Sequence, residues 1–198
     1  WPDDTAATRY ETTRQRIRPM DLSISHRHGD DHLLTFGIDR QSVRYRTASR
    51  TPDLVERDDN DAGATSTGLF AQDKLSLGDW TLRAGLRRNR IEHDYGLLGG
   101  NVPSVRGASW EKTLWSAGFR YRASPAVAFY GNAGTSFMSP AAKQIGGTVP
   151  IPSASGELAN PDLIPESGLA SDLGIDWRLA DNLNLGARVF LNRIDDII

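Results

Sequence analysis

Ser171-Asp-Leu-Gly-Ile-Asp-Trp-Arg-Leu179 is the stretch that decides the class of fold, because its residues alternate in polarity. Side chains alternate across a β-strand, so Leu173 and Trp177 fall on one face while Asp172 and Asp176 fall on the other. One face therefore favours hydrocarbon and the other favours water. Strands of this kind occur in soluble sandwiches and in the walls of transmembrane barrels, so the connections between strands must distinguish the two.

The connection before this strand is far longer than a hairpin requires. An alternating run, Val127-Ala-Phe-Tyr-Gly-Asn-Ala-Gly-Thr-Ser-Phe137, ends at Met138-Ser139-Pro140, and a segment rich in Gly and Pro then leads to Asn160-Pro-Asp-Leu-Ile-Pro-Glu166. Proline cannot donate a hydrogen bond to a strand ladder, so these prolines end strands and stiffen the loop. We therefore expect two antiparallel strands joined by a long loop.

The rest of the chain repeats this arrangement, with short and long connections in alternation. We expect strands over residues 17–27, 32–45, 67–77, 80–87, 111–122, 127–137, 171–179 and 183–191. Tight turns are expected at 28–31, 78–79, 123–126 and 180–182, and long polar connections at 47–64, 93–109 and 138–166. Outer-membrane barrels have short periplasmic turns and long extracellular loops, whereas a soluble sandwich has no reason to place every short turn at one end. The pattern predicts an all-β fold, an antiparallel transmembrane β-barrel.

The two faces of the expected strands support this interpretation. The apolar face carries Trp80, Leu82, Ala84, Leu86, Trp115, Phe119 and Tyr121, with aromatic residues near strand ends, as in interfacial girdles. The opposite face carries Thr81, Arg83, Gly85, Arg87, Asn184, Gly186, Arg188 and Asn192, which is too polar for a protein core but suits an aqueous lumen. The alternation breaks at Arg40–Ser42 and at Arg88–Arg90, where we expect a bulge or emergence of the strand above the bilayer.

Composition excludes several classes of protein and site. The 198 residues carry 23 Lys and Arg against 25 Asp and Glu, a net charge of -2, which argues against nucleic-acid binding. The chain has no cysteine, so disulfides, thiolate zinc sites and a cysteine nucleophile are excluded. No apolar run is long enough for a transmembrane helix, and a mean hydropathy of -0.45 remains compatible with a barrel that has a polar lumen.

Several clusters of polar side chains are candidate sites of chemistry. His26, His28 and His32 with neighbouring aspartates resemble metal ligands in composition, but they flank a tight turn, and a solvated periplasmic turn explains them better. The acidic run 58–61 lacks the spaced Gly and the bidentate Glu of a calcium loop. No arrangement of Ser, His and Asp suggests hydrolysis. We therefore expect no enzyme, no metal site and no cofactor.

Arginines are the most informative polar residues. Arg83, Arg87, Arg120, Arg122 and Arg188 share the polar face, where they can attract an anionic chelate or pair with carboxylates of the lumen. The alternation also directs Asn132, Ser136 and Asp172 into the lumen. The substrate-binding candidates are Arg87, Asn132, Ser136, Asp172 and Arg188.

Two motifs resemble those of a known family, the TonB-dependent outer-membrane receptors that import ferric siderophores and related nutrients. Ser136-Phe137-Met138-Ser139-Pro140 is similar to the aromatic-x-x-Pro strand end of that family, and 160–166 is similar to its Asn-Pro-x-Leu-x-Pro-Glu box. The motif residues are Phe137, Pro140, Asn160, Pro161, Leu163, Pro165 and Glu166. Gly68–Asp73, Trp80–Leu86 and Asn192–Ile197 resemble further stretches of the family, so the likeness covers most of the chain from about Thr67 onward.

The resemblance implies a location in the outer membrane of a Gram-negative bacterium, in contact with its lipid. It implies a ferric siderophore as transported ligand, captured by extracellular loops and the upper lumen, and a TonB complex that acts through a plug domain. Members of the family have 22 strands and a plug, and neither the plug nor the C-terminal strands are found in residues 1–198. We expect this chain to be an internal segment of the barrel domain that folds as an open or misclosed sheet with two unpaired edges, since about eight strands cannot enclose a plug.

Two alternatives remain at this stage. A complete small eight-stranded outer-membrane barrel with a structural or adhesive role fits the strand count, and so does a soluble ligand-binding barrel. Within the siderophore interpretation, one ligand is disfavoured. Receptors of the family that take haem resemble one another in a histidine between the two motifs, and 138–159 contains neither histidine nor tyrosine. We expect no haem extraction through this loop.

Overall fold

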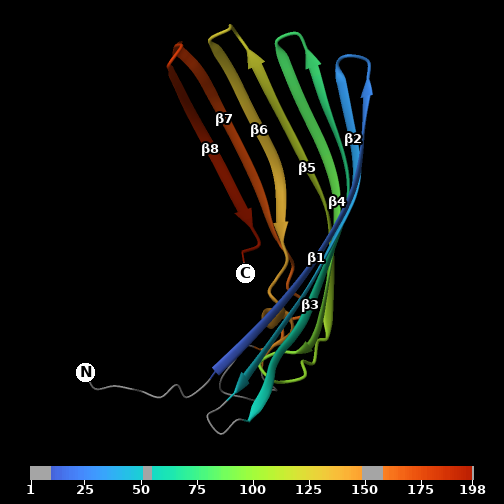
Figure 1. The fold of residues 1–198 in the computed structure, drawn as a ribbon. Helices are drawn as coiled ribbons and strands as arrows, with labels where there is room; N and C mark the ends of the chain where they lie inside the picture. Colours follow the sequence, from blue (N-terminus) through green and yellow to red (C-terminus); the bar gives the residue numbers. More distant parts are fainter. Residues whose placement is uncertain (1–9, 51–54, 149–157, 198) are drawn as a thin grey trace, which may run out of the picture.

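The structure is a computed structural model that describes residues 10–50, 55–148 and 158–197. The elements are β1 (Tyr10–His28), β2 (His32–Arg50), β3 (Glu56–Leu77), β4 (Trp80–Leu97), β5 (Gly107–Arg122), β6 (Val127–Met138), α1 (Ala142–Gly146), β7 (Glu166–Ala180) and β8 (Leu183–Asp195). The strands form one sheet in the order of the sequence, and each neighbouring pair is antiparallel. The expected all-β antiparallel architecture is confirmed (Figure 1).

The turns that join β1 to β2, β3 to β4, β5 to β6 and β7 to β8 lie at one end of the sheet, as Figure 1 shows, and α1 lies at the other. We call these the turn end and the loop end. Gly29 and Gly78 occupy the β1–β2 and β3–β4 turns with φ of 63° and 55°, a region that L-residues other than glycine rarely adopt. Glycine at these positions lets the chain reverse within three residues (29–31) and within two residues (78–79), so the turns are as short as the sequence predicts.

The expected long loop at 47–64 is wrong. β2 continues to Arg50 and β3 begins at Glu56, so only a few residues connect them; residues 51–54 of that call lie outside the described residues. The polar residues here pair in register, for example Arg44 with Gly63 and Arg46 with Asp61. Water can solvate both faces of a strand that projects beyond the membrane, so a lack of apolar alternation does not end the ladder there.

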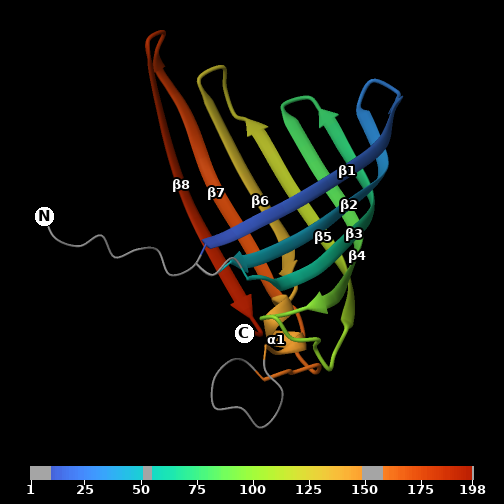
Figure 2. The same cartoon turned by 60° about the horizontal axis from the view of Figure 1, so that its bottom comes forward.

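Other strands are also longer than expected, for the same reason. β1 begins at Tyr10, β4 continues to Leu97, β5 begins at Gly107 and β7 begins at Glu166. The helix α1 was not expected. Figure 2 shows β1, β2 and β3 crossing diagonally in front of the later strands of the sheet.

Bulges occur at positions other than those considered from sequence. The register shifts between Thr47 and Ala48, between Asp61 and Ala62, and between Arg178 and Ala180. Pairing is regular through 40–42 and 88–90, so the bulge considered there is wrong, and emergence of the strands above the bilayer stays a prediction.

The sheet has an apolar band on one face, at the turn end. Its side chains include Leu22, Leu69, Leu86 and Leu173, and Leu86 keeps 62% of its surface exposed. Trp80 stacks on Tyr121 with ring centroids 4.4 Å apart, near the turns. We call this the outer face, because exposed aliphatic side chains flanked by aromatic residues are typical of a surface that contacts lipid.

The packed core is small and lies on the opposite face at the loop end. Tyr95, Leu98 and Ile145 form it, and Ile145 of α1 is completely buried. β1 and β8 are the edges of the described sheet and do not pair with each other, which agrees with the expected open sheet and not with a closed eight-stranded barrel. None of the helices in the described ranges has the length and apolar character needed to cross a bilayer.

Candidate ligand site on the lumen face

The face opposite the apolar band, which we call the lumen face, carries the candidate residues. Register and alternation place Arg87 of β4, Asn132 and Ser136 of β6, Asp172 of β7 and Arg188 of β8 on this face. α1 contacts β4 and β5 on the same side. The structure therefore joins the candidates to one surface, but it divides them into separate groups.

Arg87 forms an ion pair with Asp39 two strands away. Its Nη1 and Nη2 donate to the two carboxylate oxygens of Asp39 at 2.5 and 2.8 Å, and Nη2 also donates to Asn89 Oδ1 at 3.0 Å. The guanidinium crosses β3 directly over Gly68, where a side chain would collide with it. The pair is bidentate and about one-third exposed, so Asp39 neutralises the charge of Arg87.

Asn132, Asp172 and Arg188 form a cluster across three neighbouring strands. Arg188 Nη2 lies 2.8 Å from Asp172 Oδ1, and Asn132 Nδ2 donates to the same carboxylate at 3.2 and 3.3 Å. The Asp172 side chain is only 10% exposed, whereas that of Arg188 is 57% exposed. Asp172 therefore anchors Arg188 at one nitrogen and leaves other N–H donors directed toward the lumen.

Ser136 belongs to neither group. Its hydroxyl lies over Gly168 on β7, its register partner, near the loop end of the lumen face. Of the five candidates, the structure thus brings three together, pairs Arg87 with a residue that sequence reasoning did not select, and leaves Ser136 apart.

A basic groove lies nearer the turns. It has a volume of about 260 Å³ and is lined by Lys74, Arg83, Arg120, Tyr130 and Asn132 among others. Lys74 and Arg83 are direct register partners, and neither has a carboxylate partner among the described residues. Arg120 forms an ion pair with Asp176 at 2.9 Å. Like charges placed opposite each other are destabilising, so this groove favours an anionic group.

The residues of the two motifs fold the long loop back onto the strands. Pro140 and Pro165 are buried, and the Asn160 backbone N–H donates to the carbonyl of Gln144 in α1 at 3.1 Å. Asn160 Oδ1 accepts from the backbone N–H of Asp162 at 3.2 Å, which forms a local turn.

Leu163 completes this arrangement, because it packs against the core cluster and its carbonyl accepts from Trp110 Nε1 at 3.4 Å. Phe137 pairs in register with Ser167, and Glu166 begins β7 opposite Met138. Pro161 is exposed. These contacts are those of a structural element that holds the loop down.

His93 is a residue that sequence reasoning missed. It lies at the loop end of β4, seven residues beyond Leu86, and its ring packs edge-on against Tyr95 and Trp110. Its Nδ1 is 3.0 Å from the Tyr95 hydroxyl and its Nε2 is 3.4 Å from the Ser139 hydroxyl. The signal was hidden because 46 residues separate His93 from Ser139 in the chain.

Burial sets the protonation of this cluster. Burial lowers the pKa of His93, against an opposing effect of Asp94, and it raises the pKa of Tyr95 to about 12. The imidazole is therefore neutral at neutral pH, and both of its nitrogens are engaged by hydroxyl groups.

Residues from both clusters considered as metal sites contact other side chains. His32 Nδ1 lies 2.7 Å from Asp73 Oδ2, and Asp61 of the acidic run accepts from Arg46. The described residues contain no group of three or more side chains suited to hold a metal ion.

Comparison with solved structures identifies the fold. Similar chains include a structure described as the copper transporter OprC (TM-score 0.75, 16% identity, 94% of this chain and 31% of that one). The FrpB iron transporter of Neisseria meningitidis, F3-3 variant, has a TM-score of 0.68 at 15% identity and covers 93% and 29%. The unliganded ferric citrate transporter FecA has a TM-score of 0.66 at 19% identity and covers 95% and 29%.

The chain spans about a third of the length of these structures. No curated protein sequence matches it. A family model described as "TonB dependent receptor-like, beta-barrel" matches residues 2–198. Proteins of this family are receptors of the Gram-negative outer membrane and not enzymes, which confirms the expected location and class. The eight-stranded open sheet and the match over nearly its whole length together show that the chain belongs to the TonB-dependent receptor β-barrel family.

Proposed function

We propose that residues 1–198 form about eight strands of the wall of a larger outer-membrane barrel that imports a ferric siderophore. The open sheet and the one-third coverage of related structures support this division. In this proposal a plug domain outside the chain engages the TonB complex, and the lumen face of this chain contributes to capture of the ligand. Outer-membrane lipid covers the apolar band.

The main support for this proposal is the half-exposed side chain of Arg188 on the lumen face. Asp172 is nearly buried and fixes one nitrogen of Arg188, while Asn132 orients the carboxylate from the other side. The side chain is thus held in place before a ligand arrives, which reduces the entropy lost on binding. A ferric siderophore saturates its own metal and presents anionic oxygens at its surface, so it needs charge and shape from the protein rather than a metal ligand.

The five candidates take different roles in this proposal. Arg188 contacts the ligand, whereas Asp172 and Asn132 hold the Arg188 side chain in position. Ser136 offers a hydroxyl nearer the loop end. Arg87 supports the wall, because both oxygens of Asp39 already occupy its guanidinium.

Binding of iron-loaded siderophores to the full-length receptor tests the proposal. Arg188→Gln removes the charge, and a charged hydrogen bond is worth about 1.5–3 kcal/mol, so the Kd should rise on the order of tenfold to a hundredfold. Arg188→Lys should restore part of the affinity. Arg122→Gln is a matched control, because Arg122 also pairs with an aspartate, Asp79, but lies at the turns and outside the basic groove.

Two outcomes would contradict the proposal at different levels. If Arg188→Gln and Arg122→Gln bind the siderophore equally well, the role of Arg188 is wrong. If deletion of the full-length receptor gene leaves growth unchanged on every ferric chelate tested, the siderophore assignment itself is wrong.

A further inference from the structure

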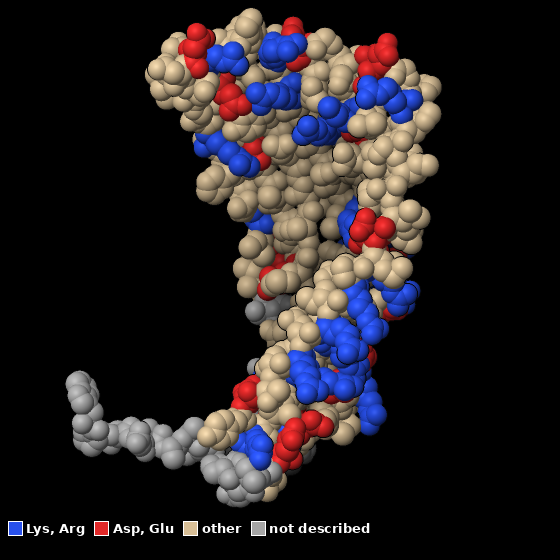
Figure 3. Space-filling view, viewed as in Figure 1, with Lys and Arg blue, Asp and Glu red and all other residues tan. Residues whose placement is uncertain are grey.

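Six arginines lie together on two neighbouring strands at the loop end of the sheet. They are Arg14, Arg16 and Arg18 of β1 and Arg40, Arg44 and Arg46 of β2. We call this group the arginine strip. Figure 3 shows basic side chains gathered along the diagonal course of β1. The charge balance of the whole chain is nearly neutral, so this concentration is local.

The arginine strip lies on the outer face and not on the lumen face. Arg14, Arg16 and Arg18 alternate in phase with Leu22 and Ile24 of the apolar band. On β2, Arg40 likewise follows Phe36 and Ile38 at intervals of two residues. The strip therefore cannot contact a ligand in the lumen.

The height of the strip corresponds to the membrane surface. The last outward apolar residue of β2 is Ile38 and the next outward residue is Arg40, about 7 Å further along the strand. On β1 the same step runs from Met20 to Arg18. The apolar band ends where the strip begins, so the arginines lie beside the headgroups of the outer leaflet and above its hydrocarbon.

Some arginines of the strip lie opposite one another, so their positive charges repel. Arg14 is the direct register partner of Arg46, and Arg16 is that of Arg44. Like charges directly opposite each other on a sheet are destabilising. An anion placed between the two strands would remove this repulsion.

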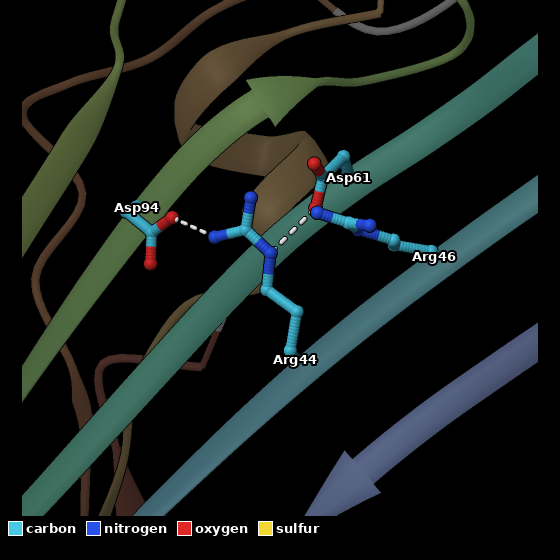
Figure 4. A network of polar contacts seen from close by, with 4 residues as sticks. All are labelled: Arg44, Arg46, Asp61 and Asp94. Carbon is cyan, nitrogen blue, oxygen red and sulfur yellow. Dashed lines mark hydrogen bonds and ion pairs between the residues drawn. The ribbon is translucent and has the colours of Figure 1, made fainter.

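Carboxylates reach only one side of the strip. Arg44 Nη1 lies 2.5 Å from Asp94, and Asp61 contacts both Arg44 and Arg46, as Figure 4 shows. By contrast, Arg14, Arg16, Arg18 and Arg40 have no carboxylate partner within the described ranges 10–50, 55–148 and 158–197. The free positive charge is therefore concentrated at β1.

A cavity of about 600 Å³ lies over these residues. It is lined by Arg14, Gln15, Arg16, Arg18, Ser42, Arg44 and Arg46. Its size suits a charged headgroup, and arginine forks match the oxygens of a phosphate in geometry as well as in charge.

We propose that the arginine strip binds the phosphate groups of anionic lipids in the outer leaflet of the outer membrane. The proposal commits to a lipid because the strip adjoins the apolar band: a lipid can place its phosphates in the cavity while its acyl chains cover Leu22 and Ile24. Free phosphate has the same charge but gains nothing from the band. The inference depends on the orientation of the sheet in the membrane and not on the ligand transported.

Lipid binding by the purified full-length receptor in neutral detergent tests the proposal. The probes are bisphosphorylated lipid A and the same lipid with both phosphates removed. The variant is Arg16→Gln with Arg18→Gln. The control is Arg88→Gln with Arg90→Gln, which removes the same charge from the outer face at arginines already paired with Glu111 and Glu92.

Each basic residue near a charged membrane surface contributes about 1 kcal/mol, so the Arg16 and Arg18 variant should bind the phosphorylated lipid about 30-fold more weakly. The control should retain most of the affinity, and the lipid without phosphates should bind all three proteins weakly and equally. Arg16→Lys with Arg18→Lys keeps the charge and should recover most of the binding. Affinity for the phosphorylated lipid should fall with added salt.

Several results would overturn the proposal. Equal binding of the two lipids would show that the phosphates do not matter. Full competition by millimolar inorganic phosphate would identify a site for free anions instead. Unchanged lipid binding together with a lower oligomeric state in the Arg16 and Arg18 variant would show that the strip pairs with an acidic surface of a second copy.

Discussion

Gly68→Ala is expected to destabilise the barrel by breaking an ion pair between two other strands. The Arg87 guanidinium crosses β3 over Gly68, and a Cβ at that position would overlap its terminal nitrogens. Arg87 must then move away from Asp39 and give up a bidentate, charge-assisted contact about one-third exposed. We estimate a loss of about 1.5 kcal/mol for this contact after allowing for solvent, offset by about 0.5 kcal/mol from replacing glycine within a strand. The net change is about 1 kcal/mol.

Urea unfolding of the full-length receptor in detergent micelles measures this change. Gly186→Ala is the matched control, because an added Cβ at Gly186 meets no atom closer than 3.8 Å and should stabilise the strand slightly. In an Asp39→Asn background, Gly68→Ala should cost much less, since the ion pair is already lost. If Gly68→Ala and Gly186→Ala have the same free energy of unfolding, the steric argument is refuted.

Three further predictions concern the outer face, the cluster of His93, Tyr95 and Trp110 at the loop end, and the long loop between β6 and β7. Leu86→Arg places a charge on the lipid side and should lower the free energy of unfolding by about 2–4 kcal/mol, whereas Ser116→Arg on the lumen face should have little effect in the same urea titration. Burial in the folded state lowers the pKa of His93, so the stability of the cluster around His93 is fully present above the unfolded pKa of about 6.5 and is lost as pH falls below it. Hydrogen-exchange protection of α1 should therefore decrease as pH falls. His93→Gln should abolish this pH dependence. Haem titration of the full-length receptor should give no sharp Soret shift that depends on residues 138–159; a shift that disappears on their deletion would contradict this expectation.

The hairpins and their faces could be predicted from sequence because they depend on local rules. Gly78-Asp79 leaves too few residues for anything but a tight turn, and alternation from Trp80 to Leu86 requires a strand with one apolar face. The length of the strands could not be predicted in the same way. Polar residues such as those from Glu56 to Ala62 can form either a solvated strand or a solvated loop, and nothing in their order indicates which of the two forms. In the structure they pair with β2.

The candidate site shows a similar division. Alternation assigned Asn132, Asp172 and Arg188 to one face, and cross-strand register then brought them into contact. Register was also decisive for Arg87, whose partner Asp39 is 48 residues away in sequence. Sequence spacing carries no information on such contacts, so a pair that spans an intervening strand can be found only once the order of strands is known.

The unequal length of the strands gives the wall an uneven rim. β3 has 22 residues and β2 has 19, whereas β6 has 12 and β8 has 13, and all are aligned at the turn end. A difference of nine residues between β3 and β8 corresponds to about 30 Å along the strand. The part of the wall formed by β1 to β4 therefore extends further at the loop end than the part formed by β6 to β8. The rim that these described strands contribute to the mouth of the barrel is therefore oblique.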